Sequence, residues 1–506
     1  MMNNQTNKFI YLPIIVLFTF VLVGCSHTGN LETQVVETPI PVINTPSPEI
    51  NTFIEKTKIV SQTQTPEPEE IEFEPALPEY SLSVKFDYSN QSARVNQTII
   101  YVNNSKQMLN DIRLATDTLR YPGSFSLENV FVNSNEEKLE QRKYYFTLLL
   151  NEGLAPGEEI EIQINYFLSI PPLPPPADDL KPGIFGYSTV QTNLVDWYPF
   201  IPPLSENGEW LLHDPWFYGE YLVYDLANFY VEIELINSPT NTTIAASSII
   251  PTSQVDNLYH YSSSRVRNFV WSLSPSYVVE TKELNGITIS THTFPFHQPG
   301  GLHVLQEASK AVELYSRLFS RYPRENLTIV EADFLDGMEY DGLFFLSRGF
   351  YNLFDYTPQN YLTAIAVHET AHQWWYASIA NDQALEPWLD EALCTYSEVL
   401  FYEEYYPELV DWWWEYRVNY YQPGGYINKS IYEYQGFVPY RNATYLQGAK
   451  FLQSIRDELG DKIFFDFLKE YATNQKDKIS SQTYFFDLLR NYSDIDFYQS
   501  SNYLFK

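Results

Sequence analysis

The chain has 506 residues and carries 64 acidic against 31 basic residues, which gives a formal net charge of −33 at pH 7. Nucleic-acid binding needs clustered Lys and Arg, so this acidity argues against nucleic acid as a partner. The length is sufficient for two or three domains with sizeable cores, and the acidic surface either suits cationic substrates or simply keeps the protein soluble.

The first 25 residues have the pattern of a targeting signal. A polar start is followed by an apolar run from Phe9 to Gly24, and Leu22-Val23-Gly24-Cys25 resembles the lipobox of bacterial lipoproteins. The apolar run is short for a membrane span and polar sequence follows it closely. We therefore expect a lipid anchor at Cys25 that holds the protein to the outer face of a membrane, at the bacterial cell surface or in the periplasm. A secretory signal with a chance cysteine is the alternative.

Residues 26–78 are rich in Thr, Pro, Glu and Asn, so we expect a disordered linker there. From residue 79 apolar and polar residues alternate, with many β-branched and aromatic side chains, which is typical of strands. An antiparallel β domain is therefore predicted over residues 79–295, interrupted by an extended proline-rich connection at 171–176. Its clearest strands are expected at 81–89, 94–104, 144–151, 159–169, 228–237 and 267–274.

A second domain is predicted over residues 296–506. Residues 302–322 have apolar positions at three- and four-residue spacing, which indicates an amphipathic helix, and a strand is expected at 326–334. Further helices follow. Cys394 is the one cysteine besides Cys25, so no intramolecular disulfide is expected. A buried thiol that behaves as a small apolar side chain is the simpler interpretation of Cys394, and a metal ligand is the alternative.

The clearest chemical pattern in this domain is H-E-x-x-H, formed by His368, Glu369 and His372. On a helix, residues four positions apart lie on one face, so both imidazoles can reach a single metal ion. Glu391 follows after eighteen residues, and two histidines with a glutamate form one of the ligand sets of catalytic zinc. The pattern therefore predicts one zinc ion per chain, held by His368, His372 and Glu391. A chance match on a buried structural helix is the alternative.

The sequence around the motif also suggests where its helix begins and ends. Thr357 is expected to cap the helix, Pro358 to lie in its first turn and Asn381 to stop it. Glu398 follows Glu391 by seven residues, on the same face of a second helix. There it could accept a hydrogen bond from a histidine ligand and fix its tautomer. An ordinary solvated glutamate is the alternative for Glu398.

These motifs resemble those of the gluzincin zinc metallopeptidases of the aminopeptidase N and leukotriene hydrolase family. HETAH, eighteen residues and then the glutamate of WLDEA have that family's spacing. The family's upstream motif is G-x-M-E-N, and its downstream tyrosine lies in Y-x-K-G. The matching segments here are Asp336-Gly337-Met338-Glu339-Tyr340, which keeps Met-Glu but not the first glycine or the asparagine, and Tyr445-Leu446-Gln447-Gly448.

The resemblance implies a fold and a set of roles. The expected fold is a saddle-like antiparallel β domain followed by a thermolysin-like, mostly helical peptidase domain. Glu369 would be the catalytic base, and Tyr445 would be the catalytic donor that stabilises the oxyanion. Glu339, with Met338 and Gly337, would bind the free amino terminus of the substrate.

The expected function is that of a zinc aminopeptidase which removes amino-terminal residues from peptides outside the cytoplasmic membrane. A broad endopeptidase would share the zinc residues without needing Glu339, and is one alternative. An inactive peptidase fold that serves as a surface-binding lipoprotein is another. The family also includes an epoxide hydrolase activity, to which no residue of this sequence points.

Overall fold

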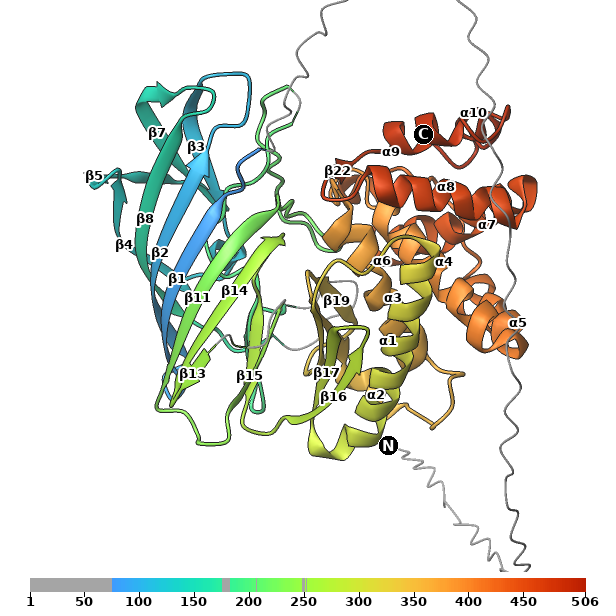
Figure 1. The fold of residues 1–506 in the computed structure, drawn as a ribbon, viewed down its shortest axis with the longest axis horizontal. Coiled ribbons are helices and arrows are strands. Elements are labelled where there is room, and N and C mark those ends of the chain that lie inside the picture. The colour runs from blue at the N-terminus through green and yellow to red at the C-terminus, as the bar shows by residue number, and fades with distance from the viewer. Residues whose placement is uncertain (1–74, 175–182, 206, 248–250, 252) are drawn as a thin grey trace, which may run out of the picture. The chain divides into compact units, whose positions relative to one another are not determined.

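The computed structural model describes residues 75–174, 183–205, 207–247, 251 and 253–506. These residues all fall in one compact unit, in which a β domain is followed by a mostly helical domain (Figure 1). The predicted fold class is therefore confirmed. The expected signal over 1–25, with its lipidation site at Cys25, and nearly all of the expected linker lie outside the described residues. Within the described part of the chain, none of the helices combines the length and apolarity needed to cross a membrane.

The β domain is built on an eight-stranded sheet. Buried and exposed residues alternate along its central strands, because successive side chains of a strand point to opposite faces. Neighbouring strands of this sheet pair antiparallel, except that β1 and β11 pair in parallel. The order is β13 (Ser253–Val255), β14 (Leu258–Val266), β11 (Ala227–Ile236), β1 (Glu79–Asp87), β2 (Ser92–Val102), β8 (Glu159–Ser169), β4 (Phe125–Val132) and β5 (Asn135–Glu137).

Two smaller sheets complete this domain. One has the order β3 (Leu109–Ala115), β7 (Tyr145–Leu154) and β6 (Leu139–Gln141). The other has the order β12 (Thr243–Ala246), β15 (Trp271–Ser274), β10 (Thr192–Leu194) and β9 (Gly186–Tyr187). Part of the proline-rich connection is described, and there Pro172 forms an isolated bridge with Tyr187.

The second domain begins with a mixed five-stranded sheet. Its order is β16 (Val278–Leu284), β17 (Ile287–Thr293), β18 (Asn326–Ala332), β20 (Leu343–Ser347) and β19 (Gly337–Tyr340). Because β17 pairs in parallel with β18, this sheet includes residues that precede the expected domain start at 296. Met338 and Glu339 lie on the edge strand β19.

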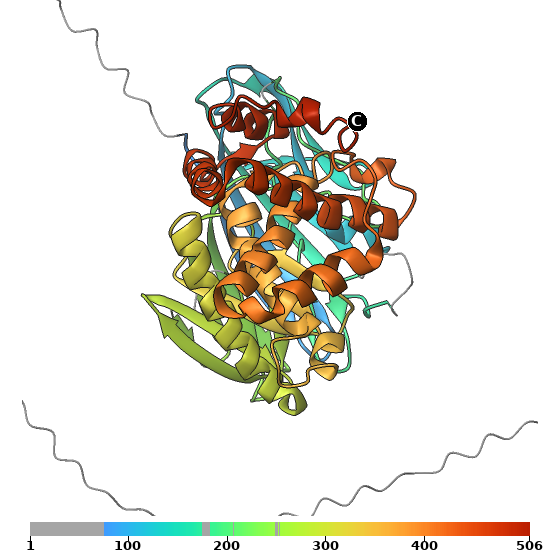
Figure 2. The ribbon, with the colours of Figure 1, turned by 90° about the vertical axis from the view of Figure 1, so that its right-hand side faces the viewer.

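Helices pack on this sheet and form the rest of the domain (Figure 2). A single apolar core joins the sheet to the long helices. The helices are α1 (Gln298–Leu318), α2 (Arg348–Asn352), α3 (Tyr361–Ala371), α4 (Trp388–Tyr405), α5 (Val410–Trp412), α6 (Phe437–Arg441), α7 (Gly448–Leu459), α8 (Asp461–Asn474), α9 (Gln482–Leu489) and α10 (Phe497–Ser500), and a small sheet pairs β21 (Ala380–Asn381) with β22 (Ile479–Ser480).

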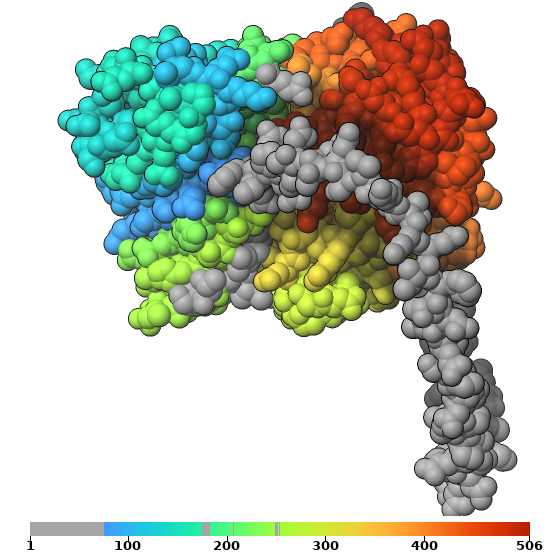
Figure 3. All heavy atoms as spheres, turned by 45° about the horizontal axis from the view of Figure 1, so that its top comes forward, coloured from blue at the N-terminus to red at the C-terminus, as the bar shows by residue number. Residues whose placement is uncertain are grey.

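The two domains are held together by buried polar contacts. Arg267 of the β domain is 1% exposed; its backbone N–H donates to Asp341 Oδ2 at 2.9 Å, and its Nε donates to the Tyr376 carbonyl at 2.9 Å. Gln191 Nε2 also donates to the Glu331 carbonyl at 2.9 Å. In the space-filling view, blue to green atoms of the first domain border on yellow to red atoms of the second (Figure 3). The β domain is therefore positioned to contribute residues to a site in the second domain.

Candidate metal centre

The helix α3 carries the H-E-x-x-H motif and is buried from Leu362 to Ala371. Asn360 caps it, because its side chain accepts a hydrogen bond from the Thr363 backbone N–H at 2.9 Å. The prediction that Thr357 caps the helix is wrong, and so is the prediction that Pro358 lies in its first turn. Both residues precede the helix, where the Thr357 hydroxyl accepts a hydrogen bond from the Gln359 backbone N–H.

The helix α3 ends at Ala371, ten residues before the expected stop at Asn381. Trp375 and Tyr376 have non-helical backbone angles, with φ/ψ of −94°/58° and 166°/−65°. This break turns the chain, so that α4 can return across α3 and bring Glu391 to the histidines. Glu391 lies in the first turn of α4, where the helix dipole favours a negative charge.

The three expected metal ligands converge. Glu391 Oε2 lies 3.3 Å from His368 Nε2 and 3.5 Å from His372 Nε2. Zinc–ligand bonds of about 2.0–2.2 Å at tetrahedral angles would hold the ligand atoms about 3.3–3.6 Å apart. All three side chains are buried. Both distances therefore fit a zinc ion, and the two histidines and the glutamate leave a fourth position for water or substrate.

The second nitrogen of each histidine has a partner that fixes the ring. His368 Nδ1 lies 2.9 Å from Glu398 Oε1, and His372 Nδ1 lies 3.2 Å from the Trp375 carbonyl. An Nδ1–H that donates to these oxygens leaves the Nε2 lone pair free for metal. Glu398 is fully buried, which excludes the alternative of a solvated side chain. Its carboxylate also pairs with Arg417, at 2.8 Å between Arg417 Nη2 and Glu398 Oε1.

Glu369 lies beside the ligands and is buried, and its Oε2 has no hydrogen-bond partner among the described residues. Burial raises the pKa of its carboxyl well above the usual value. Its Oε1 is packed so closely against Gly337 that a Cβ added to this glycine would lie 2.1 Å from that oxygen. Gly337, in the segment expected to bind substrate, is thus required to leave room for Glu369.

Tyr445 lies across the metal ligands from the strand β19, in the helical segment Asn442–Gln447. Its ring is stacked with that of His368, with 6.0 Å between centroids, and its hydroxyl donates to Glu391 Oε1 at 2.5 Å. Burial, together with the charge of Glu391, raises the pKa of this phenol well above its usual value. Tyr445 is therefore a hydrogen-bond donor directed at the metal ligands.

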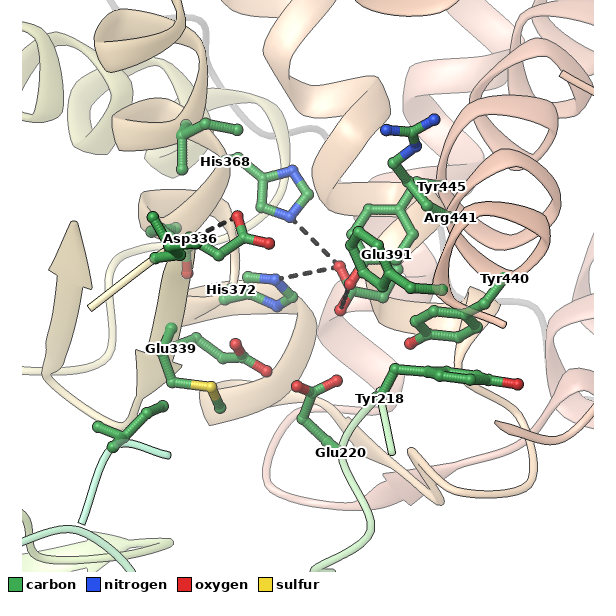
Figure 4. Close-up of a pocket in the computed structure, with 18 of the residues that line it drawn as sticks. Tyr218, Glu220, Asp336, Glu339, His368, His372, Glu391, Tyr440, Arg441 and Tyr445 are labelled. Carbon is green, nitrogen blue, oxygen red and sulfur yellow. Dashed lines mark hydrogen bonds and ion pairs between the residues drawn. The ribbon is translucent and has the colours of Figure 1, made fainter. Parts of the chain in front are cut away.

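A wall of carboxylates borders the ligands on another side. Glu339 is 4% exposed and its Oε1 accepts from Gln383 Nε2 at 3.1 Å. The same Nε2 donates to Asp390 Oδ2 at 2.8 Å, so Gln383 holds both carboxylates in place. One oxygen each of Glu220, Glu339 and Glu391 lie within 4.8 Å of one another, and Figure 4 shows Glu220 and Glu339 side by side below His372.

Glu220 comes from the β domain and was not found from the sequence. Its neighbour Gly219 has a φ of 73°, and a Cβ there would lie 2.7 Å from Ile431 Cγ2. Tyr218, on the other side, donates from its hydroxyl to the Tyr434 carbonyl at 2.6 Å. The Tyr-Gly-Glu sequence at 218–220 was the available signal, because a glycine flanked by polar residues in a loop permits such close packing.

A cavity of about 300 Å³ is lined by the three expected ligands and by Glu369, Tyr445, Glu339 and Glu220. Met338, expected with Glu339 to bind substrate, lines it, and so do Asp336, Tyr440 and Arg441. Cys394 is buried on α4, with its Sγ 4.0 Å from the Trp375 carbonyl. Among the described residues, the groups of side chains that could hold a metal do not include Cys394.

The fold and the donor set together define a zinc metallopeptidase domain. The family can be named as well, because residues 303–500 match the sequence profile described as the peptidase family M1 domain. This domain belongs to peptidase family M1, whose members use a catalytic zinc ion.

Individual relatives are similar to this chain in sequence or in fold. Aminopeptidase M1-D from Oryza sativa subsp. japonica is 32% identical over 141 residues, which is 26% of this chain and 16% of that protein. A mutant of an M1 zinc metallopeptidase from Deinococcus radiodurans, bound to a Tyr-Ser-Ala substrate, has a TM-score of 0.62 at 18% identity, over 85% of this chain and 94% of that one. A further structure of an M1 zinc metallopeptidase from that organism has a TM-score of 0.60 at 18% identity, over 85% of this chain and 93% of that one.

Proposed function

We propose that this protein is a zinc-dependent aminopeptidase that removes residues from the amino terminus of peptides. The proposal rests on one observation, the carboxylate wall of Glu339 and Glu220 within 4.8 Å of the metal ligand Glu391. When the first peptide bond of a substrate lies at the metal, the free amino group of that substrate lies one residue away. Two carboxylates at this distance from the metal ligands suit that ammonium group. The name of the rice relative, an aminopeptidase, supports the same activity.

His368, His372 and Glu391 would hold the zinc ion. When bound, zinc supplies Lewis-acid polarisation of a carbonyl oxygen and of a water molecule. Glu369 accepts a proton from the attacking water and then delivers it to the leaving amine. Its buried, unpartnered Oε2 and the absence of a side chain at Gly337 leave it free for both transfers.

Tyr445 would stabilise the negative charge that develops on the scissile carbonyl oxygen. Its hydroxyl donates to Glu391 Oε1 in the free protein, so it already points at the metal ligands. A preorganised donor in a site with little water contributes more than a donor in solvent does. The Tyr445 ring stacks on the His368 ring, and this contact fixes the direction in which the Tyr445 hydroxyl points.

Exopeptidase activity would depend on Glu339 and Glu220. Both are aligned by neighbours, Glu339 by Gln383 and Glu220 by the tightly packed Gly219. An ammonium group between them gains charge-assisted hydrogen bonds, whereas an acetylated amine does not. A longer peptide that passes through this end of the cavity would bring no positive charge to these two carboxylates, which disfavours internal cleavage.

The test uses the full-length protein and one fluorogenic peptide with either a free or an acetylated amino terminus. We expect hydrolysis of the free form, with kcat/KM about 100-fold higher than for the acetylated form. Glu339→Gln should lower only the value for the free form. Glu458→Gln, which changes an exposed carboxylate on α7, is the matched control and should alter neither. Equal cleavage of both peptides would instead support a broad endopeptidase.

We also propose, from the sequence alone, that Cys25 is acylated and that the enzyme acts outside the cytoplasmic membrane. The lipobox-like Leu22-Val23-Gly24-Cys25 supports this proposal. Cells that express the full chain should incorporate labelled fatty acid into it, and Cys25→Ser should abolish the incorporation. Equal labelling of both proteins, or none of the unaltered chain, would contradict a lipid anchor at this cysteine.

A further inference from the structure

The catalytic cavity contains one guanidinium group that has no carboxylate partner among the described residues, that of Arg441. The other arginine that lines the cavity, Arg417, forms an ion pair with Glu398 at 2.8 Å. Arg441 Nη2 instead donates to the amide oxygen of its neighbour Asn442 at 2.9 Å, and its guanidinium lies over the ring of Tyr421, with 4.0 Å to the ring centroid. Both contacts are with uncharged groups, so they orient the Arg441 side chain without neutralising its positive charge.

The half-buried position of Arg441 makes a lone charge costly. Burial lowers the pKa of Arg441, whereas the Glu398 carboxylate outweighs burial and raises that of Arg417. A guanidinium remains charged throughout the physiological range, so Arg441 brings a permanent positive charge into the cavity. Asp336, across the cavity, accepts from the Gly337 backbone N–H at 3.0 Å, and no ion pair joins it to Arg441.

The position of Arg441 relative to the catalytic groups follows from the helix that carries it. Arg441 and Tyr445 are four residues apart in a continuous helical run, so their side chains lie on one face, with Cβ atoms about 5–6 Å apart. In Figure 4, Arg441 extends above Tyr445 and Glu391, while Glu220 and Glu339 lie below them. The cavity therefore has negative charge on one side of the metal ligands and positive charge on the other.

A peptide with its amino group at the carboxylate wall must extend away from that wall beyond the scissile bond. Each extended residue spans about 3.3–3.6 Å, so the distance from Tyr445 to Arg441 corresponds to one or two residues. A carboxylate at that point of the substrate would meet the guanidinium in the forked geometry that Arg provides.

We propose that Arg441 is a specificity determinant that binds a carboxylate of the substrate one or two residues beyond the scissile bond. The inference rests on the proposed aminopeptidase function and adds a preferred substrate class, short peptides that end close to the cleavage site. The α-carboxylate of a di- or tripeptide and an acidic side chain at the same place are the two possible sources of this group.

The test compares kcat/KM for Leu-Ala-Ala, its carboxyl-terminal amide and the amide of Leu-Ala-Glu. The unaltered protein should hydrolyse Leu-Ala-Ala about 10- to 100-fold better than its amide, since a charge-assisted hydrogen bond is lost in the amide. An equal gain for the amide of Leu-Ala-Glu would identify a side-chain carboxylate as a ligand too. Arg441→Gln should reduce the value for the free acid to that of the amide and leave the amide unchanged.

Two further variants separate this effect from general damage. Lys450→Gln removes one positive charge from an exposed position on α7 and should change no rate. Arg441→Lys keeps the charge but loses the fork, so part of the preference should remain. Equal hydrolysis of acid and amide by the unaltered protein, or an equal loss for both in Arg441→Gln, would overturn the inference alone. If the unaltered protein hydrolysed neither peptide, the result would contradict the proposed aminopeptidase function on which this inference rests.

Discussion

Adding one methyl group at Gly337 should remove activity while leaving the protein folded. In Gly337→Ala the new Cβ would lie 2.1 Å from Glu369 Oε1, 2.7 Å from its Cδ and 3.0 Å from Ile365 Cγ2. Gly337 does not have a positive φ, so alanine brings no backbone strain. The closest clash is with the end of a flexible side chain, which can rotate away.

The size of the effect follows from these distances. Relief of the contact requires Glu369 to move by roughly 1 Å, and a misplacement of that size costs about 100-fold in rate. Since the rotation relieves the clash, the free energy of unfolding should change by about 1 kcal/mol or less. The expected signature is therefore loss of kcat at nearly unchanged stability and zinc content.

The assay measures kcat and KM on a free-amino peptide, zinc by atomic absorption and Tm by calorimetry. Gly424→Ala is the matched control, because a Cβ at Gly424 meets no atom within 4 Å and that glycine also lacks a positive φ. A Gly337→Ala protein with more than a third of the normal kcat would refute the packing argument. Loss of zinc together with activity would also refute it, because the substitution touches no metal ligand.

Four further predictions concern single side chains. Glu369→Gln should keep zinc and lose nearly all turnover, and Tyr445→Phe should lose about 100-fold or more in kcat; a near-normal rate in either would remove the assigned role. Glu398→Gln should weaken zinc binding by about 10- to 100-fold in a chelator competition, because His368 loses its orienting carboxylate. Burial lowers the pKa of His292 from 6.5 to about 4, so the unfolded chain takes up that proton first as the pH falls, and stability is lost below pH 6.5. Between pH 7 and pH 5, the free energy of unfolding of His292→Gln should therefore fall by about 2 kcal/mol less than that of the unaltered protein, as measured by denaturant titration. An equal fall in both proteins would contradict this.

The features that could be predicted from the sequence are those set by local geometry. Two histidines four residues apart must share a helix face, and α3 brings His368 and His372 together for that reason. The alternating runs became strands because one face of each is buried. The fold class and the zinc cofactor, inferred from motifs and their spacing, were confirmed by the comparisons.

The features that could not be predicted depend on contacts between distant segments. Glu220 reaches the cavity because Gly219 packs on Ile431, and although Tyr-Gly-Glu signals a closely packed glycine, it does not specify this distant partner. The helix α3 begins at Tyr361 rather than near Thr357, because Asn360 and not Thr357 caps it, and both residue types are suitable caps. The strands β16 and β17 resemble those of the preceding domain, and only the pairing of β17 with β18 assigns this hairpin to the next one.

The central claim, that this protein is an aminopeptidase, is tested most directly by following its products. The zinc-loaded, full-length protein would be incubated with a hexapeptide that has a free amino terminus, and samples would be analysed by mass spectrometry over time. We predict a ladder of products, each shortened by one residue from the amino terminus. Fragments produced by cleavage at internal bonds, without that ladder, would contradict the aminopeptidase assignment and the role of Glu339.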